Sequence, residues 1–486
     1  DLAVHLTGYV ATISQSEKTG DPVLELPGFK IGKSGIEKSF DSKMRGRGAQ
    51  RQVEVNALGR IIRKLPGEET QIGHDIELTI DVSLQSFSTK RLAQGNSVYI
   101  PVDDPRIQRA VSEGRNLPPG TDPVNGYVNV DYKGNVQAPE SGAAVVMDAF
   151  NGDVLALAST PGFDPNSFSS GLNAADWENL LSNPRSPMTN KAVSGQYSPG
   201  STFKMIVCLA ALEAGVAHQE TKVNCSGMIE FGDSRFHCWK KDGHGWLNMI
   251  DAIEQSCDVY LYELAKRVGI KRIGEMAARF GFGEAFNFGL PGENRGLIPT
   301  PAWKRKTFGQ AWHAGETLIT SIGQGFILCT PLQLAVMTSR LVNGGRPVLP
   351  RLMKNERAEI QKRKSLQLSP QHLHTVLKGM DKVVNGSQGT ARKVVDQSMK
   401  FQFGGKSGSV QVKRISLDER ESGKLKNKDR PWHERDHAMF VAFAPLKSPR
   451  YVVSVVVEHG GGGSTMAAPI ARDILAEALR LNPSRL

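Results

Sequence analysis

Hydrophobic positions in this chain form short runs that polar turns separate. Two apolar runs, residues 142–148 and 154–158, flank Asn151-Gly152-Asp153, a pattern that predicts a β-hairpin of two strands. Residues 438–444 and 451–458 predict a second antiparallel pair. Helical spacing is found in five further segments, at 203–212, 250–268, 331–342, 373–384 and 467–479. These elements predict an α+β fold with a central antiparallel sheet flanked by helices.

The first 74 residues differ in pattern from the rest, and we expect them to form a separate, small, β-rich domain. Their hydrophobic alternation is short, as in Val53-Glu54-Val55, and turns such as Leu26-Pro27-Gly28 are frequent. Residues 75–486 then form the main domain. Within it, residues 97–139 carry prolines, glycines and charges without periodicity, so we expect a surface insertion there.

The charge balance narrows the classes of partner. The chain of 486 residues carries 60 basic and 49 acidic side chains, a net charge of +11, which is compatible with anionic membrane surfaces and cell-wall polymers. We expect no nucleic-acid binding, because no nucleic-acid motif is present and basic residues mostly alternate with acidic ones. No apolar run reaches the roughly 18 residues that span a bilayer. Since the chain begins at Asp1, we expect that a leader or an anchor has been removed.

A serine and a lysine three residues apart are the first candidates for chemistry. Pro199-Gly200 is a turn signal, and Ser201 and Lys204 fall in the first turns of the helix that follows. Side chains at this spacing share one helix face, so the amine can approach the hydroxyl. Burial among apolar neighbours favours a neutral amine, which is a usable base. On its own, however, Ser-x-x-Lys is equally compatible with an ordinary helix start that carries a surface lysine.

Two later segments add weight to this interpretation through their order along the chain. Ser256-Cys257-Asp258 lies inside a helical pattern, and Lys406-Ser407-Gly408-Ser409 opens a predicted strand. Small residues in such a strand permit close approach of a ligand. Each segment alone is a weak signal, since Lys-[Ser/Thr]-Gly also occurs at Lys18 and at Lys33.

The five cysteines leave two interpretations open. Cys208 and Cys329 lie in apolar stretches and are expected to be buried thiols. Cys225 and Cys238 bracket a polar segment and could close a disulfide in an oxidising compartment. Alternatively, the same segment could bind zinc, with a ligand set drawn from Cys225, Asp233, His237, Cys238, Asp242 and His244. The spacing matches no standard zinc finger.

Together, the three segments form the signature of penicillin-recognising serine enzymes. The chain resembles the monofunctional class B penicillin-binding proteins, in particular those of cell elongation. The resemblance spans nearly the whole chain and includes residues 142–161, 315–325, 330–335, 389–391 and 459–463. It implies a transpeptidase domain with a penicillin-binding/serine β-lactamase-like fold, preceded by a pedestal domain of the dimerisation type.

The resemblance also implies roles for individual residues. Ser201 would attack the penultimate D-alanine carbonyl of a stem peptide and form an acyl-enzyme, which an amine from a neighbouring stem resolves into a cross-link. Lys204 would take the serine proton, and Ser256 would relay a proton to the leaving group. On the strand, Lys406 would supply positive charge, and the hydroxyls of Ser407 and Ser409, on either side of Gly408, would bind the substrate carboxylate. The backbone N–H groups of Ser201 and Ser409 would form an oxyanion hole. Asp258 stands where the wider superfamily often has asparagine.

Other activities use the same nucleophile. A β-lactamase is disfavoured by the length, the pedestal-like domain and the lack of an obvious second carboxylate base. A D,D-carboxypeptidase, or a penicillin-binding sensor or scaffold without turnover, stays open as an alternative.

The resemblance further implies stem peptides and β-lactams as ligands, a glycan polymerase of the SEDS type and the MreC scaffold as partners, and a single-pass anchor ahead of Asp1. The expected location is the periplasmic face of the bacterial inner membrane. No cofactor is required by this chemistry, and a structural zinc stays a hypothesis.

Overall fold

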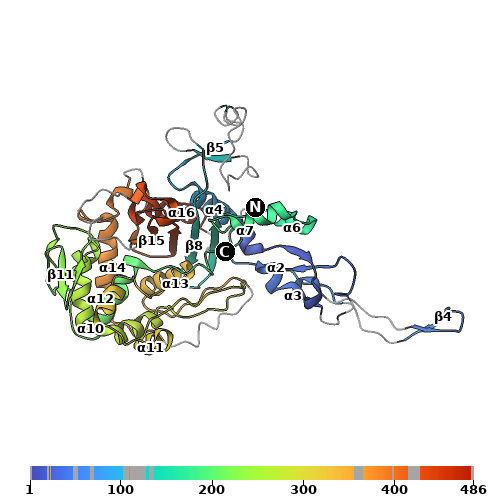
Figure 1. The fold of residues 1–486 in the computed structure, drawn as a ribbon, viewed down its shortest axis with the longest axis horizontal. Coiled ribbons are helices and arrows are strands. Elements are labelled where there is room, and N and C mark those ends of the chain that lie inside the picture. Colours follow the sequence, from blue (N-terminus) through green and yellow to red (C-terminus); the bar gives the residue numbers. More distant parts are fainter. Residues whose placement is uncertain are drawn as a thin grey trace.

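The structure is a computed structural model, and it describes residues 3–18, 21, 23–46, 53–65, 71–101, 105, 109, 127–130, 136–354, 365–396, 399–413 and 427–482. One large part of the chain combines helices with a sheet, and the N-terminal residues extend from it to one side (Figure 1). Among the described residues, no helix has the length and apolar character needed to cross a bilayer.

A five-stranded antiparallel sheet with the order β14-β15-β16-β8-β9 forms the centre of the large part. Its strands are β8 Gly142–Asp148, β9 Val154–Thr160, β14 Gly404–Val410, β15 His437–Ala444 and β16 Tyr451–Val457. Every residue of β8, β9 and β16 is buried, as their continuous apolar sequences require for strands covered on both faces. The hairpin and the second strand pair that the sequence predicts are both confirmed. Strand β14 lies at the edge of the sheet, so one side of its backbone faces away from β15.

Helices cover both faces of this sheet (Figure 1). Helices α4 Val82–Gln94 and α16 Ala468–Leu481 pack on each other and on the strands. Helix α13 Pro331–Val342 contacts β8, β15 and β16, and all of its residues are buried. Its N-terminus is well defined, because Thr330 caps it and proline occupies the first helical position.

A helical lobe stands beside the edge strand. It contains η3 Gly200–Phe203, α8 Lys204–Glu213, α9 Met249–Glu254, α10 Asp258–Arg279, α11 Pro301–Phe308, α12 Ala314–Ser321 and α14 Pro370–Asn385. Helix α8 is buried against α10, while α14 packs against α9 and β14. The lobe also carries a small β-region made of β10 Val223–Cys225, β11 Met228–Phe231, β12 Ser234–His237 and β13 Gly245–Leu247. The edge strand and the lobe therefore bring distant sequence segments together.

The N-terminal part contains three short helices in addition to strands. Its elements are α1 Val4–Thr7, β1 Val10–Thr12, β2 Lys30–Gly32, α2 Gly35–Ser39, α3 Asp41–Arg45, β3 Val53–Val55 and β4 Ile61–Lys64. Leu6, Ile36 and Phe40 belong to the same apolar core as the sheet. The Ser169 hydroxyl, in α6 Pro165–Ser170, donates to Val10 O at 2.8 Å. The two parts are therefore packed on each other.

The expected insertion at residues 97–139 contains a three-stranded antiparallel sheet. Its strands are β5 Val98–Pro101, β6 Tyr127–Val130 and β7 Val136–Gln137. Most other residues of this segment lie outside the described residues. One more helix, α7 Ala174–Ser182, follows α6 at the surface.

Candidate active site

Ser201 lies in the 3-10 turn η3, immediately before helix α8. The turn is fixed by two glycines in the left-handed region, Gly200 with φ +55° and Gly323 with φ +70°. The Gly200 N–H donates to Gly323 O at 2.8 Å. A Cβ at position 323 would lie 2.0 Å from Gly200 O, so only glycine fits there. Gly323 belongs to the stretch 315–325 that carries the family resemblance, but its contact with Gly200 does not follow from the sequence.

Lys204 begins helix α8 and is completely buried. Its Nζ donates to Ser256 O at 2.8 Å and to Ser256 Oγ at 3.2 Å, and it forms an ion pair with Asp258 Oδ1 at 2.7 Å. The prediction of a buried lysine is confirmed. The expectation that apolar neighbours alone surround its amine is wrong, because the Asp258 carboxylate lies next to it.

Ser256 sits in a break between two helices. The single helix expected over residues 250–268 is instead α9 and α10, which are separated at Ser256 by its left-handed φ of +54°. Cys257 caps α10, and its Sγ accepts from Tyr260 N at 3.5 Å. This break turns the Ser256 hydroxyl toward both lysines, since Lys406 Nζ also donates to Ser256 Oγ, at 2.9 Å.

Lys406 reaches the same hydroxyl from strand β14. It is completely buried, and its Nζ also donates to Ser407 O at 3.0 Å. Burial, together with the nearby charge of Lys204, lowers the pKa of Lys406 well below its usual value. Burial also raises the pKa of Asp258, although Lys204 opposes this shift. The Ser256 hydroxyl therefore contacts the amines of both lysines, an arrangement that suits proton transfer.

The remaining predicted residues lie further along β14. The Ser407 hydroxyl is 2.9 Å from the hydroxyl of Thr390, and Ser409 Oγ accepts from Gly463 N at 3.1 Å. A Cβ at Gly408 would lie 3.3 Å from both Pro199 O and Thr202 Cγ2. Position 408 therefore allows the edge strand to run close along the turn that carries Ser201.

The structure thus brings three distant segments together. Lys204, Ser256, Asp258 and Lys406 form one hydrogen-bonded cluster. Ser201 lies one turn before Lys204, next to the strand that carries Ser407 and Ser409. A hydroxyl nucleophile, buried amines and a strand at the edge of the sheet are parts that acyl transfer through a serine uses.

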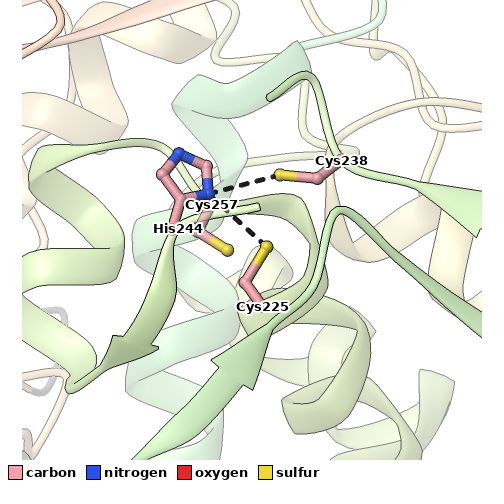
Figure 2. A group of neighbouring side chains, drawn as sticks. All are labelled: Cys225, Cys238, His244 and Cys257. Atoms are coloured by element: carbon pink, nitrogen blue, oxygen red, sulfur yellow. Dashed lines mark hydrogen bonds between the residues drawn. The ribbon is translucent and has the colours of Figure 1, made fainter. Parts of the chain in front are cut away.

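A second cluster lies directly behind this one. Cys225, Cys238, His244 and Cys257 point their ligand atoms toward one another (Figure 2), and these atoms all lie within 4.8 Å of each other. His244 Nδ1 is 3.5 Å from Cys225 Sγ and 3.6 Å from Cys238 Sγ. A nitrogen and a sulfur bound to a tetrahedral zinc at about 2.1 and 2.3 Å lie roughly 3.6 Å apart, so the two Nδ1–Sγ distances suit the metal. Three cysteines and one histidine are also a common structural zinc set.

Two of the three sulfurs are favoured as thiolates, while hydrogen bonds with Cys225 and Cys238 raise the pKa of the third, Cys257. Hydrogen bonds with Cys257 and His244 lower the pKa of Cys225 to about 6, and they lower the pKa of Cys238 further. Thiolates are the form of cysteine that binds metal.

The structure differs at two points from the alternatives that the sequence left open for this region. The disulfide between Cys225 and Cys238 is absent, because both thiols are free and face His244 instead. In the expected ligand set, Asp233 lies in an exposed turn between β11 and β12, Asp242 is also exposed, and His237 lies outside the group. Cys257 is the fourth residue of this group. In the sequence it lies beside Ser256, far from the other three residues, so it was not among the expected ligands.

The two clusters are directly connected. Cys238 Sγ accepts from Asp258 N at 3.4 Å, and the next residue, Trp239, donates its N–H to Asp258 Oδ2 at 2.9 Å. Trp239 Nε1 donates to Ser256 O at 3.1 Å. The loop that carries Cys238 therefore holds the carboxylate that pairs with Lys204.

Family models and known proteins match this chain closely. Residues 142–476 match the penicillin binding protein transpeptidase domain, and residues 1–78 match the penicillin-binding protein dimerisation domain. Peptidoglycan D,D-transpeptidase MrdA of Acinetobacter baumannii is 32% identical over 97% of this chain and 64% of its own length. MrdA of Haemophilus influenzae is 32% identical over 98% of this chain and 68% of its own length. The chain thus spans about two thirds of the length of these relatives.

Solved structures show the same likeness. A complex between penicillin-binding protein 2 and MreC from Helicobacter pylori matches with a TM-score of 0.79 and 29% identity, over 99% of this chain and 78% of that one. Penicillin-binding protein 2 of Pseudomonas aeruginosa, in complex with WCK 5153, matches with a TM-score of 0.76 and 32% identity, over 99% and 90%. A peptidoglycan synthase complex that coordinates polymerization and crosslinking matches with a TM-score of 0.72 and 28% identity, over 98% and 74%.

Proposed function

The chain belongs to the penicillin-binding protein transpeptidase family, and we propose that it is a serine D,D-transpeptidase that cross-links peptidoglycan stem peptides in cell-wall elongation. One observation carries this proposal. The Ser256 hydroxyl accepts hydrogen bonds from two buried lysines, at 3.2 Å from Lys204 Nζ and at 2.9 Å from Lys406 Nζ. Of these lysines, Lys204 lies one helical turn after Ser201. No purely structural need accounts for two buried amines around one hydroxyl, since burying charge is costly.

Acylation follows from this geometry. The Lys204 amine first gives one proton to the Asp258 carboxylate, 2.7 Å away, and is then neutral. Ser201 Oγ forms a bond to the penultimate D-alanine carbonyl carbon, and its proton passes to this neutral amine. Lys204 contacts Ser256 Oγ, so a proton can move through this hydroxyl to the nitrogen of the departing D-alanine as the carbon–nitrogen bond breaks. Lys406 holds the Ser256 hydroxyl in place from the other side.

The negative oxygen of the tetrahedral intermediate needs donors. We assign this role to the backbone N–H groups of Ser201 and Ser409, one in the 3-10 turn η3 and one on the edge strand. Losing a single such donor typically lowers the rate by about a hundredfold or more. An amine from a second stem peptide then attacks the acyl-enzyme, forms the cross-link and releases Ser201.

Product analysis tests this proposal. The protein is incubated with glycan strands that carry pentapeptide donors and free amine acceptors, and the products are separated by mass. Cross-linked dimers that disappear in a Ser201→Ala variant are the expected result. Release of D-alanine without cross-links would instead assign a carboxypeptidase, and an acylated protein without peptide turnover would assign a sensor. A Ser201→Ala variant as active as the wild type would overturn the assignment of the nucleophile.

The proposed partners follow from the relatives. One related structure is a complex of penicillin-binding protein 2 with MreC, and another is a peptidoglycan synthase complex that coordinates polymerization and crosslinking. We propose that this protein likewise binds an MreC scaffold and a glycan polymerase of the SEDS type, at the periplasmic face of the inner membrane through a single-pass anchor.

We further propose that Cys225, Cys238, His244 and Cys257 bind a structural zinc ion. Zinc would fix the loop that carries Trp239 and thereby the position of Asp258. Catalysis itself requires no cofactor in this proposal.

Metal content tests the zinc site. Protein purified without chelators is expected to hold about one zinc per chain by plasma mass spectrometry. Cys257→Ser should lose most of this zinc, while Cys329→Ser, a change at a buried thiol outside the cluster, should retain it. Wild-type protein without zinc, even after incubation with zinc salts, would contradict the site.

A further inference from the structure

A threonine outside the three sequence segments contacts the proposed carboxylate subsite. Thr390 Oγ1 lies 2.9 Å from Ser407 Oγ, although 17 positions separate the two residues in the chain. Thr390 follows helix α14, whereas Ser407 lies in β14. The contact therefore depends on how the lobe packs against the sheet.

The loop that carries Thr390 is held in place by its backbone. Thr390 N donates to Glu254 O at 3.3 Å, and Gln388 N donates to Glu254 Oε1 at 3.0 Å. Ala391 N donates to Val383 O in α14 at 2.9 Å. Glu254 is buried at the end of α9, two positions before Ser256. The Thr390 hydroxyl is thus anchored to the same turn that positions Ser256.

The hydrogen bonds around the two strand serines explain what this anchor does. A serine hydroxyl has one proton to donate and two lone pairs that accept. Ser409 Oγ accepts from Gly463 N, which leaves the Ser409 proton free for a ligand. When the Thr390 hydroxyl donates to Ser407 Oγ, the Ser407 proton is free in the same way. Two hydroxyl donors on alternate residues of one strand point to the same side, as a carboxylate requires.

We infer that Thr390 is a positioning residue of the carboxylate subsite, which orients the Ser407 hydroxyl toward the terminal carboxylate of the D-alanyl-D-alanine donor. This inference rests on the proposed function, because it takes Ser407 as the group that binds the carboxylate. Thr390 acts through Ser407 and makes no step of the acyl transfer itself.

Steady-state kinetics with a stem pentapeptide test the inference. Thr390→Val keeps the shape of the side chain but removes the hydroxyl, and it should lower kcat/KM about five- to tenfold, mainly through a higher KM. Thr390→Ser should stay within about twofold of the wild type. Thr89→Val is a matched control, because this α4 threonine donates its hydroxyl to Gln85 O on the far side of the sheet from β14.

A double-mutant cycle separates the inference from the proposed function. If Thr390 acts through Ser407, Thr390→Val added to Ser407→Ala should cause no further loss. Wild-type kinetics in Thr390→Val, or additive losses in the double variant, would overturn the inference while Ser407→Ala remains impaired. Wild-type kinetics in Ser407→Ala would instead overturn the carboxylate role in the proposed function. Thermal unfolding of each variant identifies a loss that comes from misfolding.

Discussion

Removing the Asp258 carboxylate tests whether an ion pair holds the buried amine of Lys204. Asp258→Ala leaves this amine completely buried without its partner at 2.7 Å. Breaking a buried ion pair by removal of one partner typically costs about 3–5 kcal/mol. Burial raises the pKa of Asp258, so the pair is incompletely compensated and we expect the lower end of this range. For the main domain of roughly 410 residues, with an unfolding entropy of about 2.1 cal/mol/K per residue, about 3 kcal/mol lowers Tm by about 3.5 °C.

Thermal unfolding followed by circular dichroism measures this effect. Asp258→Asn keeps a side-chain oxygen near Lys204 and should unfold between the wild type and Asp258→Ala. Asp233→Ala removes an exposed aspartate from the same lobe and should leave Tm unchanged within about 1 °C. If Asp258→Ala unfolds at the temperature of this control, the ion pair does not stabilise the site and the reasoning fails.

Two further changes have outcomes that the structure predicts. Gly323→Ala places a methyl group 2.0 Å from Gly200 O and should slow acylation by a fluorescent penicillin about a hundredfold. Gly309→Ala is the control, because Gly309 has a similar φ of +67° but open space around it. Equal acylation rates in the two variants would contradict the role of Gly323. Burial lowers the pKa of Lys191 from 10.5 to about 8, so between these values the unfolded chain holds a proton that the folded chain lacks. The unfolding free energy relative to Lys191→Met should therefore rise by about 3 kcal/mol from pH 8 to 10.5 in denaturant titrations, and a constant difference would contradict the burial cost.

Much of this fold could be predicted from the sequence, because its signals are local. Strands β8 and β9 follow from two apolar runs around Asn151-Gly152, and α13 follows from its spacing and Pro331. The order of the three segments also predicted that they form one site, and the structure brings Lys204 and Lys406 together at the Ser256 hydroxyl.

What the sequence did not predict depends on contacts between distant segments. The sequence pattern predicts one helix over 250–268 that continues across Ser256. In the structure, the left-handed φ of Ser256 breaks this helix, and lysines from two other elements bind this residue. Cys257 meets Cys225, Cys238 and His244 because α10 packs against β10. Thr390 likewise meets Ser407 through the packing of α14 against β14. Local periodicity carries no signal for such contacts.

Peptide mapping after penicillin labelling tests the central claim most directly. The protein is incubated with a fluorescent penicillin, digested and analysed by mass spectrometry. A single stable adduct on the hydroxyl of Ser201, absent from a Ser201→Ala variant with unchanged Tm, is the predicted result. An adduct on another side chain, or persistent labelling of the folded alanine variant, would show that this serine is not the nucleophile.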